Sequence, residues 1–250
     1  VLNRRIAART ANEAGDVRLA RPIRAEECAA RPVRIGYLSP DFRLHPTSLL
    51  LGEMLAWHDR HRFEVVAYPL CADDGSEAGR TVLGGADRVV NLAALDDAAA
   101  ARRIADDDID LLLDLGGYND RSRPGILARR PARLQVSWLA FMATSGAPWI
   151  DYVLADRVSL PDAIRVHFSE ACLRLPGTFF PCAYAAFNVA PARRDVFGLP
   201  SGKRLLAALH APYKIDPYTF AVWLDLLRQA ADSVLVLLDG RREVRQRLCD

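Results

Sequence analysis

Short apolar runs alternate with amphipathic stretches along most of this 250-residue chain. The runs with the length and composition of strands are 33–38, 63–70, 109–115, 134–139 and 152–155. After the first run, Leu50, Met54 and Trp57 follow the i, i+4, i+7 spacing of a helix, predicted over 48–57, and the alanine-rich stretch 93–106 is also predicted to be helical. Strands that alternate with helices indicate a mostly parallel sheet covered by helices, so we expect an α/β fold.

A second alternating unit is predicted after the linker PARRDVFGLPSG, whose prolines and glycines interrupt regular structure. It has strands over 204–210 and 233–238, and the helix between them begins with Asp216 as N-cap and Pro217 at its first position. We therefore expect three regions, namely a helical lead-in over 1–30, an N-terminal α/β domain over 31–195 and the start of a second one over 196–250. The chain opens on Val1 and closes within a helical pattern, so we expect it to be a fragment of a longer protein.

The composition excludes several classes of protein. Apolar residues make up 51% of the chain, enough for a sizeable core, and the net charge of +2 gives no electrostatic reason to expect binding to nucleic acid or to a membrane. No apolar run approaches the ~20 residues of a membrane span. The five cysteines lie far apart with no CxxC pair, which predicts neither a zinc site nor a disulfide framework. Their odd number suits a reducing compartment, so we expect the protein in the cytoplasm.

Four loops that follow predicted strands carry the candidate chemistry, because ligands bind beyond the carboxyl ends of the strands in open α/β sheets. These loops are SPDFRLHPTS, GGYNDRSR, FMATSGAPW and APYKIDP. In the first, His45 ionises near neutral pH and is either a general base or a loop histidine bonded to the backbone. In the last, Lys214 is one of only two lysines, and it either neutralises a diphosphate beside the helix start or lies on the surface.

For two further motifs, a purely structural interpretation is at least as well supported as a functional one. The stretch GGYNDRSR either wraps a phosphate with backbone N–H groups or makes a plain strand-to-helix turn. The D-x-D within DDDID, residues 106–110, holds a metal in some sugar transferases, but here it leads into the apolar run LLLDL. We interpret it as the acidic end of a helix.

Taken together and in order, these segments are much more specific than any one of them. RIGYLSPDFRLHPTS, FEVVAYPLCADDGS, IDLLLDLGGY, RPARLQVSWLAFMATSGAPWIDYVLAD and YKIDP resemble the catalytic region of the O-linked N-acetylglucosamine transferases, a family that includes the Spindly proteins. The resemblance extends over about 34–238. It implies a GT-B architecture of two Rossmann-like domains that face each other across a cleft, and tetratricopeptide repeats that precede the catalytic region.

The resemblance also implies roles for individual residues. His45 matches the histidine of the family's H-P-T motif, which is assigned as catalytic base, and Thr47 belongs to the same motif. Lys214 matches a lysine that contacts the donor diphosphate, with Tyr213 near the sugar. The resemblance further places Tyr118 and the T-S-G turn (Thr144, Ser145, Gly146) at the substrate cleft. Ala211, His210 and the pair Met142–Ala143 depart from the family pattern in the donor pocket and before the turn.

The function implied is transfer of N-acetylglucosamine from UDP-N-acetylglucosamine to serine or threonine of proteins, with inversion. The partners expected are a nucleotide sugar and a protein or peptide acceptor, with no cofactor and no metal. HPTS, and Tyr213 before Lys214, favour N-acetylglucosamine over fucose. A Spindly-like fucosyltransferase, a glucosyltransferase and a degenerate, non-catalytic member that binds partners are the alternatives.

Overall fold

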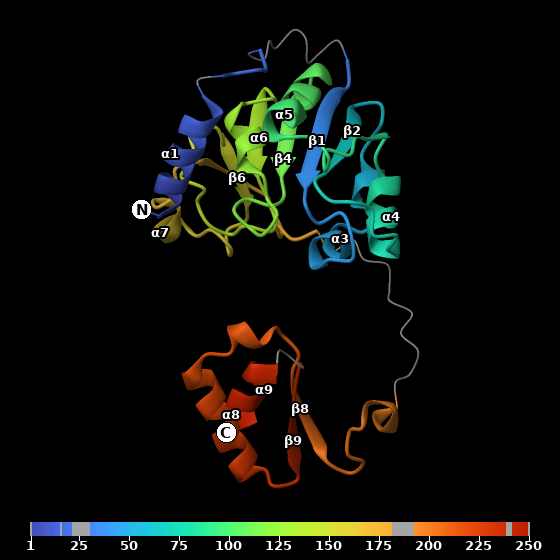
Figure 1. Cartoon of the computed structure of the whole chain (residues 1–250), viewed down its shortest axis with the longest axis vertical. Helices are drawn as coiled ribbons and strands as arrows, with labels where there is room; N and C mark the ends of the chain where they lie inside the picture. The colour runs from blue at the N-terminus through green and yellow to red at the C-terminus, as the bar shows by residue number, and fades with distance from the viewer. Residues whose placement is uncertain (1, 16, 22–30, 182–192, 239–241, 250) are drawn as a thin grey trace. The chain divides into compact units, whose positions relative to one another are not determined.

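The computed structural model describes residues 2–15, 17–21, 31–181, 193–238 and 242–249, and the chain divides into two compact units (Figure 1). The first unit is Val1–Phe187 and the second is Asn188–Asp250. This division falls within 182–192, which lies outside the described residues, as does the 22–30 part of the expected helical lead-in. The roles assigned above to the two domains stay predictions.

The first unit contains a seven-stranded sheet in which the described neighbouring strands pair in parallel. Its order is β3-β2-β1-β4-β5-β6-β7. The strands are β1 (Val33–Ser39), β2 (Phe63–Pro69), β3 (Arg88–Val89), β4 (Leu111–Asp114), β5 (Leu134–Ser137), β6 (Tyr152–Ala155) and β7 (Ala171–Arg174). The expected α/β class and parallel sheet are therefore confirmed. The pattern missed two strands: β3, which has two residues, and β7, whose four residues alternate between exposed and half-buried and contain only a three-residue apolar run.

Helices of the first unit lie on both faces of this sheet. They are α1 (Leu2–Ala14), α3 (Pro46–Leu51), the 3-10 helix η1 (Met54–Trp57), α4 (Glu77–Gly84), α5 (Asp97–Asp106), α6 (Pro124–Ala128) and α7 (Asp162–Arg165). The single helix predicted over 48–57 is wrong, because Gly52 adopts a φ of 46° and ends α3 before η1 begins. The helix predicted over 93–106 begins later than expected, since α5 starts at Asp97. The side chain of Asp96 caps it there by accepting a hydrogen bond from the Ala99 N–H.

The two faces of the sheet bury separate apolar clusters, because successive strand residues point to opposite sides. Leu38 of β1 and Leu112 of β4 pack in a cluster with residues of α1, α5 and α6. Ile35 and Tyr37 of β1 pack in the other cluster with residues of α3, η1 and α4. β1 is thus buried on both faces, which is the usual environment of a central parallel strand.

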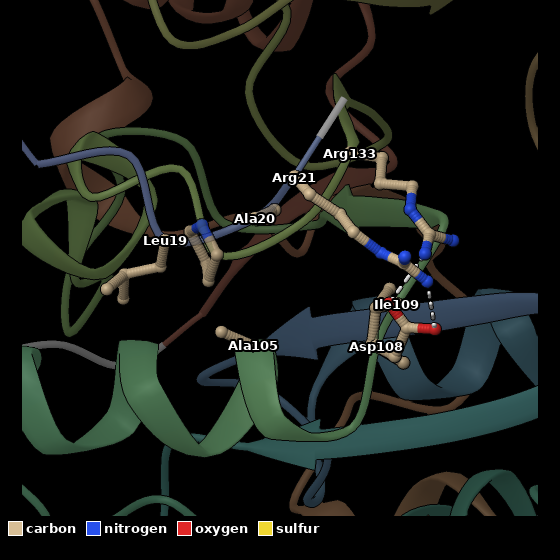
Figure 2. A pocket seen from close by; sticks show the side chains of 8 residues that line it. Leu19, Ala20, Arg21, Ala105, Asp108, Ile109 and Arg133 are labelled. Atoms are coloured by element: carbon tan, nitrogen blue, oxygen red, sulfur yellow. Dashed lines mark hydrogen bonds and ion pairs between the residues drawn. The ribbon is translucent and has the colours of Figure 1, made fainter. Parts of the chain in front are cut away.

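The DDDID motif lies at the amino edge of the sheet, between the end of α5 and β4. Each of its aspartates at 107, 108 and 110 is paired with arginine: Asp107 with Arg88 and Arg103, Asp108 with Arg133 and Arg31, and Asp110 with Arg31 and Arg133. Figure 2 shows Arg133 and Arg21 converging on Asp108 at the pocket that this network borders. The interpretation as an acidic helix end is confirmed, and these carboxylates are bonded to arginines.

The second unit consists of a parallel pair of strands with helices around it. Its elements are the 3-10 helix η2 (Arg194–Phe197), β8 (Arg204–Ala208), the 3-10 helix η3 (Pro212–Lys214), α8 (Pro217–Gln229), β9 (Ser233–Leu237) and α9 (Arg242–Cys249). The predicted start of α8 is confirmed, since the Asp216 side chain accepts a 3.0 Å hydrogen bond from the Thr219 N–H and Pro217 follows it. Over the described parts of both units, no helix is long and apolar enough to cross a membrane.

Replacing Asp110 by asparagine tests the arginine–aspartate network. Asp110→Asn leaves Arg133, whose side chain is 1% exposed, with less compensating charge, so we expect the free energy of unfolding near neutral pH to fall by about 3 kcal/mol. Burial favours the neutral form of Asp110, but hydrogen bonds from Arg31 and the Arg34 N–H hold its pKa below the ordinary value. The loss should therefore be complete above about pH 5 and shrink as the pH falls through the folded pKa, where the wild-type carboxylate is protonated too.

Asp106→Asn is the matched control, because Asp106 is exposed at the end of α5 and has no ion pair among the described residues. Its effect should stay below about 0.5 kcal/mol. Urea unfolding of both variants between about pH 3 and pH 7 makes the comparison. Equal losses in the two variants, or a loss in Asp110→Asn that does not depend on pH, would contradict the network's role.

Candidate functional site

Loops from four strands meet at the carboxyl edge of the sheet. The Leu44 N–H, in the loop after β1, donates a 2.8 Å hydrogen bond to Asp74 after β2. The Asn119 side chain, after β4, donates a 2.9 Å bond to the carbonyl of Ala140 after β5. Gly116 after β4 also lies close to Pro40 after β1. The three loops of the first unit that the sequence singled out therefore share this edge, and His45 and Tyr118 lie on two of them.

His45 is the N-cap residue of α3, and its Nδ1 atom makes all its described contacts. Nδ1 accepts a 3.2 Å bond from the Thr47 N–H, lies 3.1 Å from Thr47 Oγ1 and is 3.4 Å from an oxygen of the buried Asp41. The His45 side chain is 33% exposed, and Nε2 has no hydrogen-bond partner among the described residues. The backbone bond expected by one interpretation of His45 is therefore present at Nδ1, and the role of general base stays a prediction.

The surroundings of His45 keep the ring neutral near pH 7. Burial lowers the pKa of His45, the carboxylate of Asp41 raises it and the guanidinium of Arg43 lowers it, and the net result is below the ordinary value. A neutral imidazole is the form that can accept a proton. The electrostatics of the site are thus compatible with general base catalysis.

Asp114 is a buried carboxyl at the end of β4 that pattern analysis passed over. It accepts hydrogen bonds from the N–H groups of Gly116 (3.1 Å) and Gly117 (3.0 Å). Burial raises the pKa of Asp114 to about 6, although these two bonds oppose the shift. Since both glycine N–H groups are used in this way, the plain strand-to-helix turn is the better interpretation of the loop. A single carboxylate in an apolar strand, one residue before two glycines, is the signal that could have revealed it.

Tyr118, the residue after the two glycines, places a hydroxyl in the same region. Its ring packs edge-on against Phe141 with centroids 5.5 Å apart, and its hydroxyl is buried with no hydrogen-bond partner in the described chain. Burial, with the negative charges of Glu170 and Asp114, raises the pKa of Tyr118 to about 12. The hydroxyl is therefore a neutral donor whose bonding capacity is unused.

The T-S-G turn between β5 and β6 is held by Glu170, which the sequence analysis did not single out. Glu170 accepts hydrogen bonds from the Thr144 hydroxyl (2.7 Å), from the Ser145 N–H (2.6 Å) and from the Ser145 hydroxyl. Ser145 is buried, as is Thr47, whereas Thr144, Gly146 and Tyr118 are partly exposed. The Ser145 side chain thus fixes the turn, and no local pattern links it to a carboxylate 25 residues later.

Lys214 and Tyr213 belong to the second unit, at the end of η3. The Lys214 ammonium lies 5.9 Å from the centroid of the Tyr213 ring, which is 84% exposed, and Lys214 has no ion pair among the residues described. The carboxylate of Asp216 binds the Thr219 N–H and adds negative charge at the start of α8. The ammonium, rather than the end of that helix, is therefore the group available to an anion here.

The described residues contain no group of three or more His, Cys, Asp or Glu side chains arranged to hold a metal ion.

Comparison with known proteins relates this chain to one family of glycosyl transferases. The model of glycosyl transferase family 41 matches residues 22–187. The probable UDP-N-acetylglucosamine–peptide N-acetylglucosaminyltransferase SEC of Arabidopsis thaliana is 34% identical over 212 residues, which cover 82% of this chain and 22% of that protein. The corresponding Caenorhabditis elegans transferase is 39% identical over 149 residues, 59% of this chain and 13% of that one. The chain thus spans less than a quarter of these relatives.

A solved structure agrees with these relatives. A mutant of the Thermobaculum terrenum O-GlcNAc transferase superposes with a TM-score of 0.83 at 27% identity, over 99% of this chain and 46% of that one. This likeness confirms the GT-B-type α/β fold class that the sequence predicted.

Gly117→Ala tests how closely the loops after β4 and β5 are packed. Gly117 has a φ of 57°, and a Cβ there would overlap the side chain of Phe141, so we expect a loss of about 2–4 kcal/mol in the free energy of unfolding. Gly84→Ala is the control, because no atom lies within 4 Å of an added Cβ at this last residue of α4. It should be neutral or up to about 1 kcal/mol more stable. Chemical denaturation of both variants measures the difference, and similar effects would contradict the close approach.

Proposed function

The chain belongs to glycosyl transferase family 41, and on that premise we propose that the protein transfers N-acetylglucosamine from UDP-N-acetylglucosamine to serine or threonine hydroxyls of proteins, with inversion. The observation that carries this proposal is the placement of His45, at the carboxyl edge of the parallel sheet with a neutral ring and an open Nε2. The printed names of the relatives, which describe transfer of this sugar to peptides, support the same donor and acceptor.

In the proposed reaction, the acceptor oxygen attacks the anomeric carbon from the face opposite the nucleotide. The new carbon–oxygen bond forms as the bond between that carbon and the diphosphate breaks, and UDP leaves with the bonding electrons. The proton of the acceptor hydroxyl passes to Nε2 of His45. Inversion follows because the attack and the departure occur on opposite faces of the carbon.

Lys214 is proposed to stabilise the departing diphosphate. Negative charge grows on that group as the glycosidic bond breaks, and a preorganised cation lowers the energy of the transition state. The exposed ammonium beside Tyr213 has the required charge. Because lysine presents a point charge rather than a planar fork, it suits a diphosphate in several orientations.

The alternatives differ in donor or in activity, and both are open to direct test. Relatives named SPINDLY, such as the Arabidopsis thaliana protein that is 29% identical over 213 residues, carry the same printed activity as SEC, which supports N-acetylglucosamine rather than fucose. A glucosyltransferase shares the proposed mechanism. A degenerate member would bind partners and leave the donor intact. We propose the cytoplasm as the compartment, from the cysteine content alone.

A donor screen on the full-length protein, paired with two variants of His45, tests the proposed function. The donors to compare are UDP-N-acetylglucosamine, UDP-glucose and GDP-fucose. We expect only the first to give transfer to serine or threonine of a peptide, and mass spectrometry of the peptide detects the added sugar. His45→Asn should keep the cap of α3, since asparagine is a good N-cap residue, yet lower turnover by about 10²- to 10⁴-fold. His45→Ala should lose the same activity and also about 1 kcal/mol of stability.

These outcomes separate chemistry from folding. Wild-type turnover in His45→Asn would remove the ring from the mechanism, while transfer from another donor would leave the mechanism and change the substrate. A protein that neither transfers nor hydrolyses any donor would contradict the enzymatic proposal.

Lys214→Ala should reduce kcat/KM for the sugar nucleotide by roughly 10²-fold, which is the scale for loss of one preorganised group that stabilises the transition state. The melting temperature should change little, because the Lys214 side chain is exposed. Lys203→Ala is the matched control, since Lys203 is the other lysine and is also exposed. Kinetics and thermal melting of both variants check the role. If Lys214→Ala melts early while its folded fraction turns over normally, the lysine is structural.

A further inference from the structure

We propose that Asp41 is a positioning residue that converts His45 from a helix cap into a proton acceptor. The proposal rests on the proposed function, because it concerns how the same ring becomes competent for transfer. It arises from one feature of the site: three groups compete for Nδ1 of His45, while Nε2 has no hydrogen-bond partner among the described residues.

Asp41 is fixed in place beside the ring. It is 4% exposed, its N–H donates a 3.0 Å hydrogen bond to Ser39 Oγ, and its carbonyl accepts a 2.7 Å bond from Ser48 Oγ. Arg43 donates a 3.0 Å bond to Oδ1 of its carboxylate, and the other oxygen, Oδ2, lies 3.4 Å from Nδ1 of His45. A carboxylate held by its own backbone in this way presents a fixed acceptor to the imidazole.

The hydrogen bond that caps α3 restricts where the ring can carry its proton. When the Thr47 N–H donates to Nδ1, that nitrogen has no hydrogen, so a neutral ring carries its proton on Nε2. Nε2 is then a donor toward the ligand and cannot receive the proton of an acceptor hydroxyl. Catalysis by Nε2 requires the other tautomer, with hydrogen on Nδ1, and thus the loss of the cap bond.

Asp41 supplies the compensating bond. In the second tautomer, reached by proton exchange with water, the Nδ1–H donates to Oδ2 of Asp41, and Nε2 has a free electron pair. The acceptor hydroxyl then gives its proton to Nε2, and the resulting imidazolium keeps its Nδ1–H on the carboxylate. The Thr47 hydroxyl also reaches Nδ1, at 3.1 Å, but it carries no charge to stabilise an imidazolium.

Arg43 opposes Asp41, and this gives the test its direction. Asp41 and Arg43 are the charges that act on the ring, while Asp74 and Cys71 lie on the adjacent loop after β2, where Asp74 binds the Leu44 N–H. Asp41 stabilises the protonated ring and Arg43 destabilises it. Removing the charge of Asp41 should therefore lower the pKa of His45, and removing the charge of Arg43 should raise it. A general loosening of the loop would not shift the pKa in opposite directions in the two variants.

The experiment compares Asp41→Asn with Arg43→Gln in the full-length protein. In Asp41→Asn, Arg43 retains the side-chain oxygen, so the amide NH₂ faces Nδ1 and locks hydrogen on Nε2. We expect kcat to fall about 10- to 100-fold with the donor KM unchanged, and the acid limb of the kcat/KM profile to move to lower pH. In Arg43→Gln the acid limb should move to higher pH, because the protonated ring is then more stable.

A second measurement does not need activity. NMR titration of labelled histidines, with the His45 signal assigned by its absence in His45→Asn, reads the pKa and the tautomer of this ring in each variant. A His45 pKa that stays unchanged in both variants, or moves the same way in both, overturns the role of Asp41. If the wild-type protein transfers no sugar but His45 titrates as described, the proposed function fails and the Asp41–His45 relation stands.

Discussion

Parallel pairing of β1 with β2 on one side and with β4 on the other is the constraint on which the rest of the first unit depends. Leu38 lies opposite Tyr68 in one pairing and opposite Asp114 in the other, so the three strands end at nearly the same level. The loops that follow must therefore share one edge, where hydrogen bonds between them fix their positions. A short polar segment after β1 thus meets segments that are far away in sequence, as a ligand site in an open α/β sheet requires.

The two edges of this sheet carry carboxyl groups in different environments. At the amino edge, the carboxylates of Asp107 and Asp110 are bonded to arginines, and their pKa values lie below the ordinary range. At the carboxyl edge, the hydrogen bonds that Asp114 accepts from described residues come from backbone N–H groups, and burial raises its pKa to about 6. Both edges thus hold carboxyls with perturbed pKa values, but only Asp114 has a charge that no cation compensates among the described residues, as is common for groups at functional sites.

Two side chains at this edge are held by bonds that serve structure first. His45 caps α3 with one nitrogen, which orients the ring without using the other nitrogen. Glu170 gathers the polar groups of Thr144 and Ser145, so the T-S-G turn has a defined shape before any ligand arrives. The defined shape of the turn lowers the entropic cost of binding, since its groups do not have to be ordered at that moment.

Sequence by itself determined the elements whose burial is periodic. β1, β2, β4, β5 and β6 were predicted because central parallel strands are apolar on both faces, and the start of α8 was predicted because its cap uses neighbouring residues. The short edge strands β3 and β7, and the break at Gly52, leave no such local signature. The parallel topology also predicted which loops would carry His45 and Tyr118. Only the tertiary structure decided that Glu170 holds the T-S-G turn and that Asp41 and Asp114 are buried. Glu170 bonds to a residue 25 positions earlier, and the burial of Asp41 and Asp114 depends on segments that meet only when the chain folds.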